Sequence, residues 1–199
     1  MLYGTGLKKA HTCTTVTAGY KNYLTEETAM EVIKTKLNGV LLIKPDVFED
    51  HRGEYVETYN EELYRKSGVD IHFVQDDISV SSKNVLRGIH GDAETWKLIS
   101  CFCGKFYLVV VNCDTGSKDF GKWQAFTLSD KNRYQVLVPP KHGNGHLVLS
   151  KRAIFHYKQS SYYNPSGQFT YKWSDPRLNI WWPIKNPILS QRDEAGHFV

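Results

Sequence analysis

Residues 84–90, which read N-V-L-R-G-I-H, carry the side chains best suited to chemistry in this chain. Arg87 supplies a permanent cation, and His90 supplies an imidazole that exchanges a proton near neutral pH. The segment otherwise predicts a strand, on which neighbouring side chains alternate between faces. The two residues share one face only if Gly88 relaxes the strand with a bulge or bend.

Two further groups extend this set. Lys97 follows His90 by seven residues, and the pair Tyr157-Lys158 comes much later. A base, two cations and a phenol are the parts needed to remove and return a proton beside a carbonyl. Each also has a structural interpretation: a core histidine, a solvated lysine at a strand end, or one packing aromatic among twelve tyrosines.

Length and composition indicate one domain with an N-terminal extension. The 199 residues include 25 basic and 21 acidic side chains, a net charge of +4. This charge suits an anionic small molecule and is too weak to indicate nucleic acid. No apolar run is long enough for a membrane span. Four cysteines without a C-x-x-C pair, and no signal peptide, predict a reducing, cytoplasmic location.

Residues 39–199 show many short strand patterns separated by turns, which are typical of an antiparallel sandwich or barrel. The expected strands are 40–43, 54–59, 71–75, 78–81, 97–102, 105–112, 123–128, 134–138, 146–149 and 153–157. A short helix is expected over 60–68, and residues 139–145 read as a turn. The aromatic tail around Trp181 and Trp182 is expected to wrap the body.

Residues 1–37 form the predicted N-terminal extension, with the main domain at 38–199. Thr25 is a candidate helix cap, followed by Glu26 and Glu27 in the first turn. The apolar residues Met30, Ile33 and Leu37 then recur at helical spacing. We expect a surface helix or arm here, packed on a neighbour.

The chain resembles the dTDP-4-dehydrorhamnose 3,5-epimerases, which are RmlC-like cupins. Ten sequence blocks match in the family's order across roughly residues 39–193. They are F-E-D-H-R-G-E-Y-V-E-T-Y at 48–59, F-V-Q-D-D-I-S-V-S at 73–81, N-V-L-R-G-I-H at 84–90, K-L at 97–98, F-G-K-W at 120–123, L-V-P-P at 137–140, L-V-L-S at 147–150, Y-K-Q-S-S-Y-Y-N-P at 157–165, K-W-S-D-P at 172–176 and I-L-S-Q-R-D at 188–193. The resemblance implies an all-β cupin jelly roll with a few short helices. It also implies a homodimer in which each subunit helps to complete the other's site.

The resemblance assigns roles residue by residue. It implies that His90 is the general base, Asp193 its carboxylate partner, Tyr157 the proton donor and Lys97 the cation facing the developing oxyanion. The substrate-binding residues that it implies are Arg52, Glu57, Gln75, Asp77, Arg87, Asn144 and Arg192. It implies no cofactor and no metal.

The chain departs from the family pattern at three places. Asn144 stands where the family has a histidine, the segment 91–97 is shorter and reads G-D-A-E-T-W-K, and Gln168 replaces an acidic residue. The combination of R-G-I-H-G-D with G-N-G-H resembles a branch that acts on GDP-linked 4-keto-6-deoxy sugars, including heptoses. His142 and His146 could hold a metal with a third ligand, but the His-x-His pattern of metal cupins is missing.

The leading hypothesis is an epimerase that inverts C3, C5 or both in a nucleotide-linked 4-keto-6-deoxy sugar, with dTDP or GDP as the nucleotide. Such a reaction belongs to nucleotide-sugar biosynthesis for surface polysaccharide. The alternatives are a 3,4-ketoisomerase on the same substrates, a nucleotide-sugar-binding cupin without catalysis and, more remotely, a metal-dependent cupin oxygenase.

Overall fold

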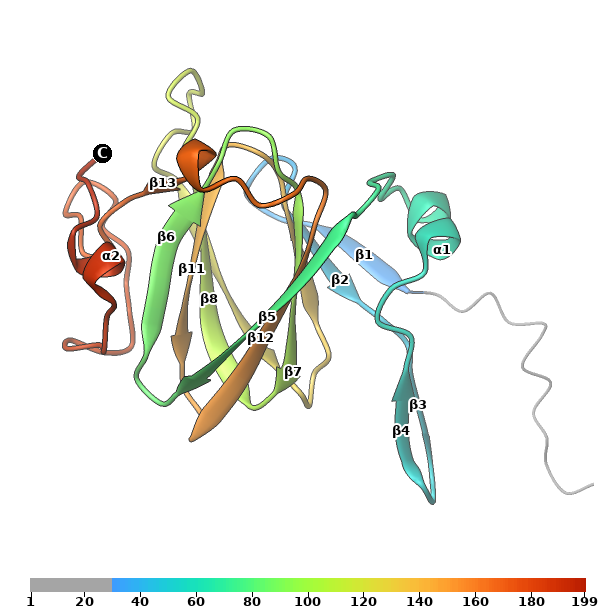
Figure 1. The fold of residues 1–199 in the computed structure, drawn as a ribbon. Coiled ribbons are helices and arrows are strands. Elements are labelled where there is room, and N and C mark those ends of the chain that lie inside the picture. The colour runs from blue at the N-terminus through green and yellow to red at the C-terminus, as the bar shows by residue number, and fades with distance from the viewer. Residues whose placement is uncertain (1–29) are drawn as a thin grey trace, which may run out of the picture.

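The computed structural model describes residues 30–199, whose strands form two antiparallel sheets facing each other (Figure 1). In spatial order, the six-stranded sheet contains β1 (Glu31–Lys34), β2 (Leu41–Lys44), β10 (Gln135–Val138), β7 (Lys97–Cys103), β12 (Arg152–Gln159) and β5 (Gln75–Ser82). The five-stranded sheet contains β13 (Phe169–Thr170), β6 (Leu86–Gly91), β11 (His142–Val148), β8 (Lys105–Asn112) and β9 (Trp123–Ser129). The expected all-β jelly roll is confirmed.

The remaining elements are short. Strands β3 (Val47–Asp50) and β4 (Gly53–Val56) form a separate hairpin, followed by helix α1 (Glu61–Lys66). A 3-10 turn, η1 (Pro165–Gly167), and helix α2 (Gln191–Glu194) lie in the C-terminal part. Asn60 caps α1 by accepting from the Leu63 amide, which confirms the helix expected over 60–68.

Apolar side chains fill three regions around the sheets. The first lies between the sheets and includes Ile99 and Phe155 from one sheet and Phe106 and Leu108 from the other. The second covers the outer face of the five-stranded sheet with the C-terminal segment, which includes Trp182. The third packs α1, through residues such as Tyr64, on the outer face of the six-stranded sheet. The tail therefore wraps the body, as expected.

Gly88 creates the irregularity in β6 that the sequence predicts. Its φ is +127°, and an added Cβ would collide with the backbone of β11 at Gly145. Opposite it, His90 pairs with Asn144 and Arg87 pairs with His146, so β6 carries one residue more than β11. Arg87 and His90 therefore face the same side of the sheet and line one cavity.

Three expectations about local structure are wrong. Residues 31–34 form a strand paired with β2, not a helix; Met30 is buried with the α1 cluster on the outer face, and Leu37 is buried between the sheets. Residues 142–148 form strand β11, not part of a turn, since Gly143 and Gly145 make room for Ile89. Residues 71–74 are not in a strand; β5 begins at Gln75.

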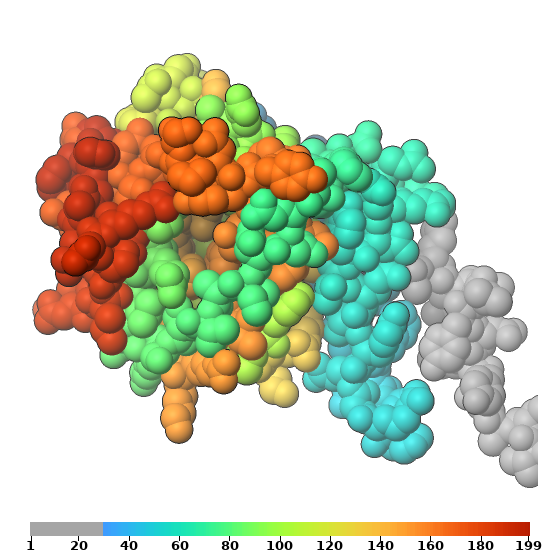
Figure 2. All heavy atoms as spheres, in the orientation of Figure 1, coloured from blue at the N-terminus to red at the C-terminus, as the bar shows by residue number. Residues whose placement is uncertain are grey.

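The hairpin β3–β4 projects from the body (Figures 1 and 2). One ion pair, between Glu54 and Arg133 at 2.8 Å, ties it to the loop before β10. Within the predicted extension, residues 31–34 join the sheet, while Thr25, Glu26 and Glu27 lie outside the described residues, so the domain boundary stays a prediction. Within residues 30–199, no helix has the length and apolar character that a bilayer crossing requires.

Candidate active site

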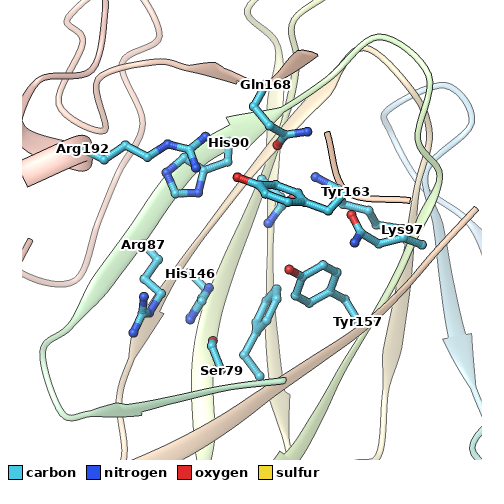
Figure 3. Close-up of a pocket in the computed structure, with 12 residues that line it drawn as sticks. Ser79, Arg87, His90, Lys97, His146, Tyr157, Tyr163, Gln168 and Arg192 are labelled. Atoms are coloured by element: carbon cyan, nitrogen blue, oxygen red, sulfur yellow. The ribbon is translucent and has the colours of Figure 1, made fainter. Parts of the chain in front are cut away.

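A cavity of about 250 Å³ opens between the two sheets (Figure 3). The five-stranded sheet contributes Arg87, His90, Asn144 and His146, and the six-stranded sheet contributes Lys97 and Tyr157 among others. The full lining is Ser79, Arg87, His90, Lys97, Asn144, His146, Phe155, Tyr157, Gln159, Tyr163, Gln168 and Arg192. His90 and Tyr157 therefore stand on opposite walls of one space.

His90 is held by the carboxylate of Asp193. The distance from His90 Nε2 to Asp193 Oδ1 is 2.7 Å, although 103 residues separate them along the chain. The same oxygen accepts from the Gly88 amide at 3.1 Å, and Oδ2 accepts from Ser190 Oγ at 2.6 Å. With both oxygens occupied, the carboxylate fixes one orientation of the His90 ring.

The sequence around Asp193 explains how it reaches this place. Ser190 is the N-cap of α2, so Asp193 lies in the first turn of that helix. The residue is 1% exposed. Burial alone would raise its pKa, but hydrogen bonds from His90, Ser190 and Gly88 outweigh burial and lower the pKa to about 2. Asp193 is therefore ionised at neutral pH.

Tyr157 remains a phenol throughout the neutral range. Burial raises its pKa to about 12, and the nearby Asp77 carboxylate adds to the shift. In β12 it pairs with Asp77 of β5 and with Ile99 of β7. These neighbours direct its ring into the cavity, where Figure 3 shows it facing away from its own sheet.

Lys97 is a buried cation with one close counter-charge. Its Nζ lies 3.9 Å from Oδ2 of Asp92, and the same oxygen accepts from Gln168 Nε2 at 2.8 Å. Burial lowers the pKa of Lys97; Asp92 opposes this shift and the Arg192 guanidinium adds to it. The short segment after His90 therefore supplies the anion beside Lys97.

The structure brings six predicted site residues to the cavity wall: His90, Tyr157, Lys97, Arg87, Asn144 and Arg192. Asp193 lies directly behind His90. Gln75 and Asp77 form a layer behind the opposite wall, where Asp77 Oδ2 accepts from Gln75 at 2.7 Å and from Gln159 at 2.9 Å. Gln75 in turn accepts from the Tyr163 amide at 2.9 Å.

Arg52 and Glu57 do not line this cavity. Arg52 lies in the turn of the β3–β4 hairpin, where its guanidinium pairs with Asp50 at 2.6 Å. Glu57 follows β4 and is exposed. The hairpin projects from the body (Figure 1), and neither residue is part of the cavity lining.

Residue types and motifs did not single out every wall residue as a candidate. Ser79, His146, Phe155, Gln159 and Tyr163 line the cavity without having been predicted to bind substrate. Alternation along β5 could have found Ser79, because it shares a face with Gln75 and Asp77. Tyr163 comes from a loop, where no periodic pattern indicates a direction.

A metal site at His142 and His146 would need a third ligand. Among residues 30–199, no three His, Cys, Asp or Glu side chains gather as a metal site would require. His142 instead places Nδ1 at 3.1 Å from the Pro140 carbonyl oxygen, and His146 lies inside the cavity.

Comparison with known proteins shows which family the chain resembles. The family model for dTDP-4-dehydrorhamnose 3,5-epimerase matches residues 34–199. The chain belongs to this family of epimerases. It is similar to the dTDP-4-dehydrorhamnose 3,5-epimerase of Shigella flexneri, with 39% identity over 171 residues that cover 84% of this chain and 94% of the relative.

Solved structures of the family agree with the fold described above. The Legionella pneumophila epimerase in complex with dTDP-4-keto-L-rhamnose aligns with a TM-score of 0.82 at 35% identity, covering 85% of this chain and 93% of that chain. A 3'-monoepimerase from Streptomyces bikiniensis in complex with dTDP-quinovose aligns with a TM-score of 0.78 at 31% identity, covering 82% and 85%. The chain is thus similar to solved structures that are named for the inversion of one centre or of two.

Proposed function

We propose that the chain inverts C3, C5 or both in a nucleotide-linked 4-keto-6-deoxy sugar, by removing a proton on one face of the ring and returning one on the other. The observation that carries this proposal is the pair His90 and Tyr157 on opposite walls of one cavity. The C–H bonds at C3 and C5 flank the C4 carbonyl, so their loss gives an enolate. Reprotonation from the far side then inverts the centre.

His90 serves as the base in this proposal. When Nε2–H donates to Asp193, the neutral ring carries its lone pair on Nδ1, which takes the substrate proton. The positive ring that results is stabilised by Asp193, which is already ionised. A positioned general base of this kind contributes about 10²–10⁴-fold to a rate.

Lys97 and Tyr157 complete the step. Lys97 faces the C4 oxygen as negative charge develops there, and a preorganised donor in such a place contributes about 3–4 kcal/mol. Tyr157 returns the proton, since its phenol stays protonated well above neutral pH. No step needs a nicotinamide, because the carbon skeleton is neither oxidised nor reduced overall, and Lys97 supplies the positive charge that a metal would otherwise provide.

The anionic part of the substrate belongs at the open end of the cavity. Arg192 is exposed at the rim and is oriented by Thr170 Oγ1, which accepts from its Nε at 2.9 Å. Guanidinium groups match phosphate oxygens through two parallel hydrogen bonds. The relatives named above support dTDP as the nucleotide, and the G-N-G-H departure keeps GDP as the second candidate.

A homodimer explains the two predicted residues that lie far from the cavity. Arg52 lies in the turn of the β3–β4 hairpin, Glu57 follows β4, and the hairpin projects from the body. In a dimer of the kind that the family resemblance implies, the hairpin reaches the cavity of the partner subunit. Arg52 then adds a second cation to the site that binds the diphosphate.

Incubation of dTDP- and GDP-linked 4-keto-6-deoxy sugars with the protein in D₂O tests the function. We expect deuterium at C3 or C5 in the product spectrum, and loss of exchange in His90→Asn. Tyr157→Phe should still remove a proton but return it slowly. A carbonyl that moves from C4 to C3 with unchanged stereochemistry would indicate a ketoisomerase. Binding without exchange would indicate a protein without catalysis, and either result would end the proposal.

A further inference from the structure

The inner end of the cavity holds polar atoms without a partner. Ser79 Oγ, Asn144 Oδ1 and His146 Nε2 are buried and have no hydrogen-bond partner among residues 30–199. All three residues line the same cavity. Buried polar atoms in proteins are nearly always hydrogen-bonded, so three such atoms in one place call for a ligand group.

His146 is the central member of this set. It is 3% exposed, and its ring stacks on Phe155 with centroids 4.1 Å apart and an interplanar angle of 10°. Phe106 packs on it at a centroid distance of 5.3 Å. These aromatic contacts fix the ring in one orientation and hold its nitrogens at the cavity wall.

The imidazole of His146 is neutral at all physiological pH values. Burial lowers its pKa to about 3; Arg87 and His90 act in the same direction, and Asp193 opposes them. A neutral imidazole has one donor nitrogen and one acceptor nitrogen. Such a group binds a hydroxyl well, attracts no phosphate and is too weak a base to take a proton from carbon.

The residues that line the cavity differ in how far they are exposed to solvent. His146 is 3% exposed and Asn144 is 8% exposed, whereas Tyr163, which lines the same cavity, is 47% exposed. The volume of about 250 Å³ is below the roughly 300–1,000 Å³ of pockets that enclose a drug-sized ligand. The space therefore suits one sugar ring, with the nucleotide outside.

We propose that His146, Asn144 and Ser79 form a subsite that recognises an uncharged hydroxyl of the sugar and thereby selects among 4-keto sugars. This inference rests on the proposed function and adds a specificity determinant to it. The hydroxyl belongs either to the ring, at C2, or to the side chain attached at C5. A bare methyl group at this end would leave all three polar atoms unpaired.

Substrate analogues combined with His146→Phe test the subsite. Phenylalanine keeps the aromatic stack on Phe155 and removes both nitrogens. The substrates are a nucleotide-linked 4-keto-6-deoxyhexose, its 2-deoxy analogue and a 4-keto sugar whose C5 side chain ends in a hydroxyl. The measurement is kcat/KM for deuterium exchange from D₂O with each substrate.

We expect the wild type to favour the sugar with the recognised hydroxyl by about 10–100-fold, because polar groups left unpaired in a site penalise the analogue that lacks the hydroxyl. His146→Phe should remove most of that preference and lower activity on the other sugars far less. His142→Phe is the matched control: His142 lies on the same strand and is also buried with an unpartnered Nε2, but it is not in the cavity lining. Its preference should equal that of the wild type.

An equal loss on all three sugars in His146→Phe, or no preference in the wild type, would overturn the subsite and leave the epimerase proposal intact. Absence of exchange in the wild type with every sugar would overturn both. Melting curves report whether each variant folds. If His146→Phe does not fold, Ser79→Ala decides by the same comparison, because it removes one hydroxyl and little volume.

Discussion

At the scale of single residues, Asp193 connects catalysis with acid stability. Its carboxylate accepts from His90, Ser190 and Gly88, and an amide in its place would turn one acceptor oxygen into a donor. We expect Asp193→Asn to lower kcat by about 10²–10⁴-fold, because the His90 ring would lose its orientation and the stabilisation of its charged form. Deuterium exchange under saturating substrate measures this loss.

The same substitution predicts a pH dependence of stability. A carboxyl group whose pKa falls on folding stabilises the native state above its unfolded pKa of about 3.9, and that contribution is lost as the pH falls toward the folded value. With a folded pKa of about 2, the contribution of Asp193 is roughly 2–3 kcal/mol at neutral pH. In urea unfolding at pH 7, the free energy of unfolding of the wild type should exceed that of Asp193→Asn. This difference should disappear between pH 4 and pH 2.

Asp76→Asn is the control for this experiment. Asp76 is exposed and pairs with Lys158 at 2.8 Å on the outer face of the sheet. Exposed pairs contribute about 0–1 kcal/mol, so this change should alter stability little at either pH. A similar loss in both variants would contradict a special role for Asp193.

Asp92 should set the alkaline limit of activity through Lys97. Burial and the Arg192 charge lower the pKa of Lys97, and the Asp92 carboxylate opposes both. Removing the Asp92 charge therefore lowers the pKa of Lys97 further. In Asp92→Asn the ammonium is lost at a lower pH, and the alkaline limb of the kcat/KM profile should move down. The side-chain oxygen that accepts from the Glu94 and Thr95 amides remains available, which limits structural damage. An unchanged alkaline limb would show that Lys97 does not act as a charge.

At the scale of elements, the β6 bulge places the base. Gly88 combines a φ of +127° with a backbone contact that leaves no room for a Cβ. Gly88→Ala should therefore destabilise the fold by about 1–3 kcal/mol and displace His90, with loss of exchange activity. Gly116→Ala is the control, since an added Cβ there would meet one side-chain atom at 3.5 Å. Thermal unfolding of both variants compares them, and equal melting temperatures would contradict this account.

Sequence patterns predicted most elements, and the family resemblance supplied about half of the cavity wall. The bulge at Gly88 and helix α1 could be predicted because local chemistry determines both. The bulge follows from a glycine between two polar residues, and the helix follows from a cap and six residues rich in charge. The helix predicted over residues 31–34 was wrong. Met30, Ile33 and Leu37 recur at helical spacing, but the segment pairs with β2, and such pairing leaves no signal in the local pattern. Glycines 143 and 145 read as turn formers, but tertiary contact with Ile89 requires them within a strand.

At the scale of the whole molecule, the hairpin gives a test of subunit sharing. Arg52→Ala and His90→Asn should each be nearly inactive as pure homodimers. If the hairpin of one subunit serves the other's cavity, a mixed dimer has one site with both residues intact and one with neither. When the two variants mix at random, half of all dimers are mixed, and each mixed dimer has one working site out of two. About a quarter of wild-type activity should therefore return.

The mixing experiment has its own contrary result. If Arg52 served its own cavity, every site in the mixed dimer would lack one residue, and activity would stay at the level of the pure variants. Refolding the two variants together and measuring deuterium exchange distinguishes the outcomes. Mass spectrometry of the mixture confirms that mixed dimers have formed.

The long separation between His90 and Asp193 also bears on how the molecule is made. A ribosome adding about 5–20 residues per second needs roughly 5–20 s to pass from one to the other across 103 residues. During that interval the nascent chain gains strands β7 to β13 and so completes both sheets, yet its imidazole has no carboxylate behind it. A product whose translation stops before Ser190 would carry a nearly complete cavity and remain inert toward the sugar.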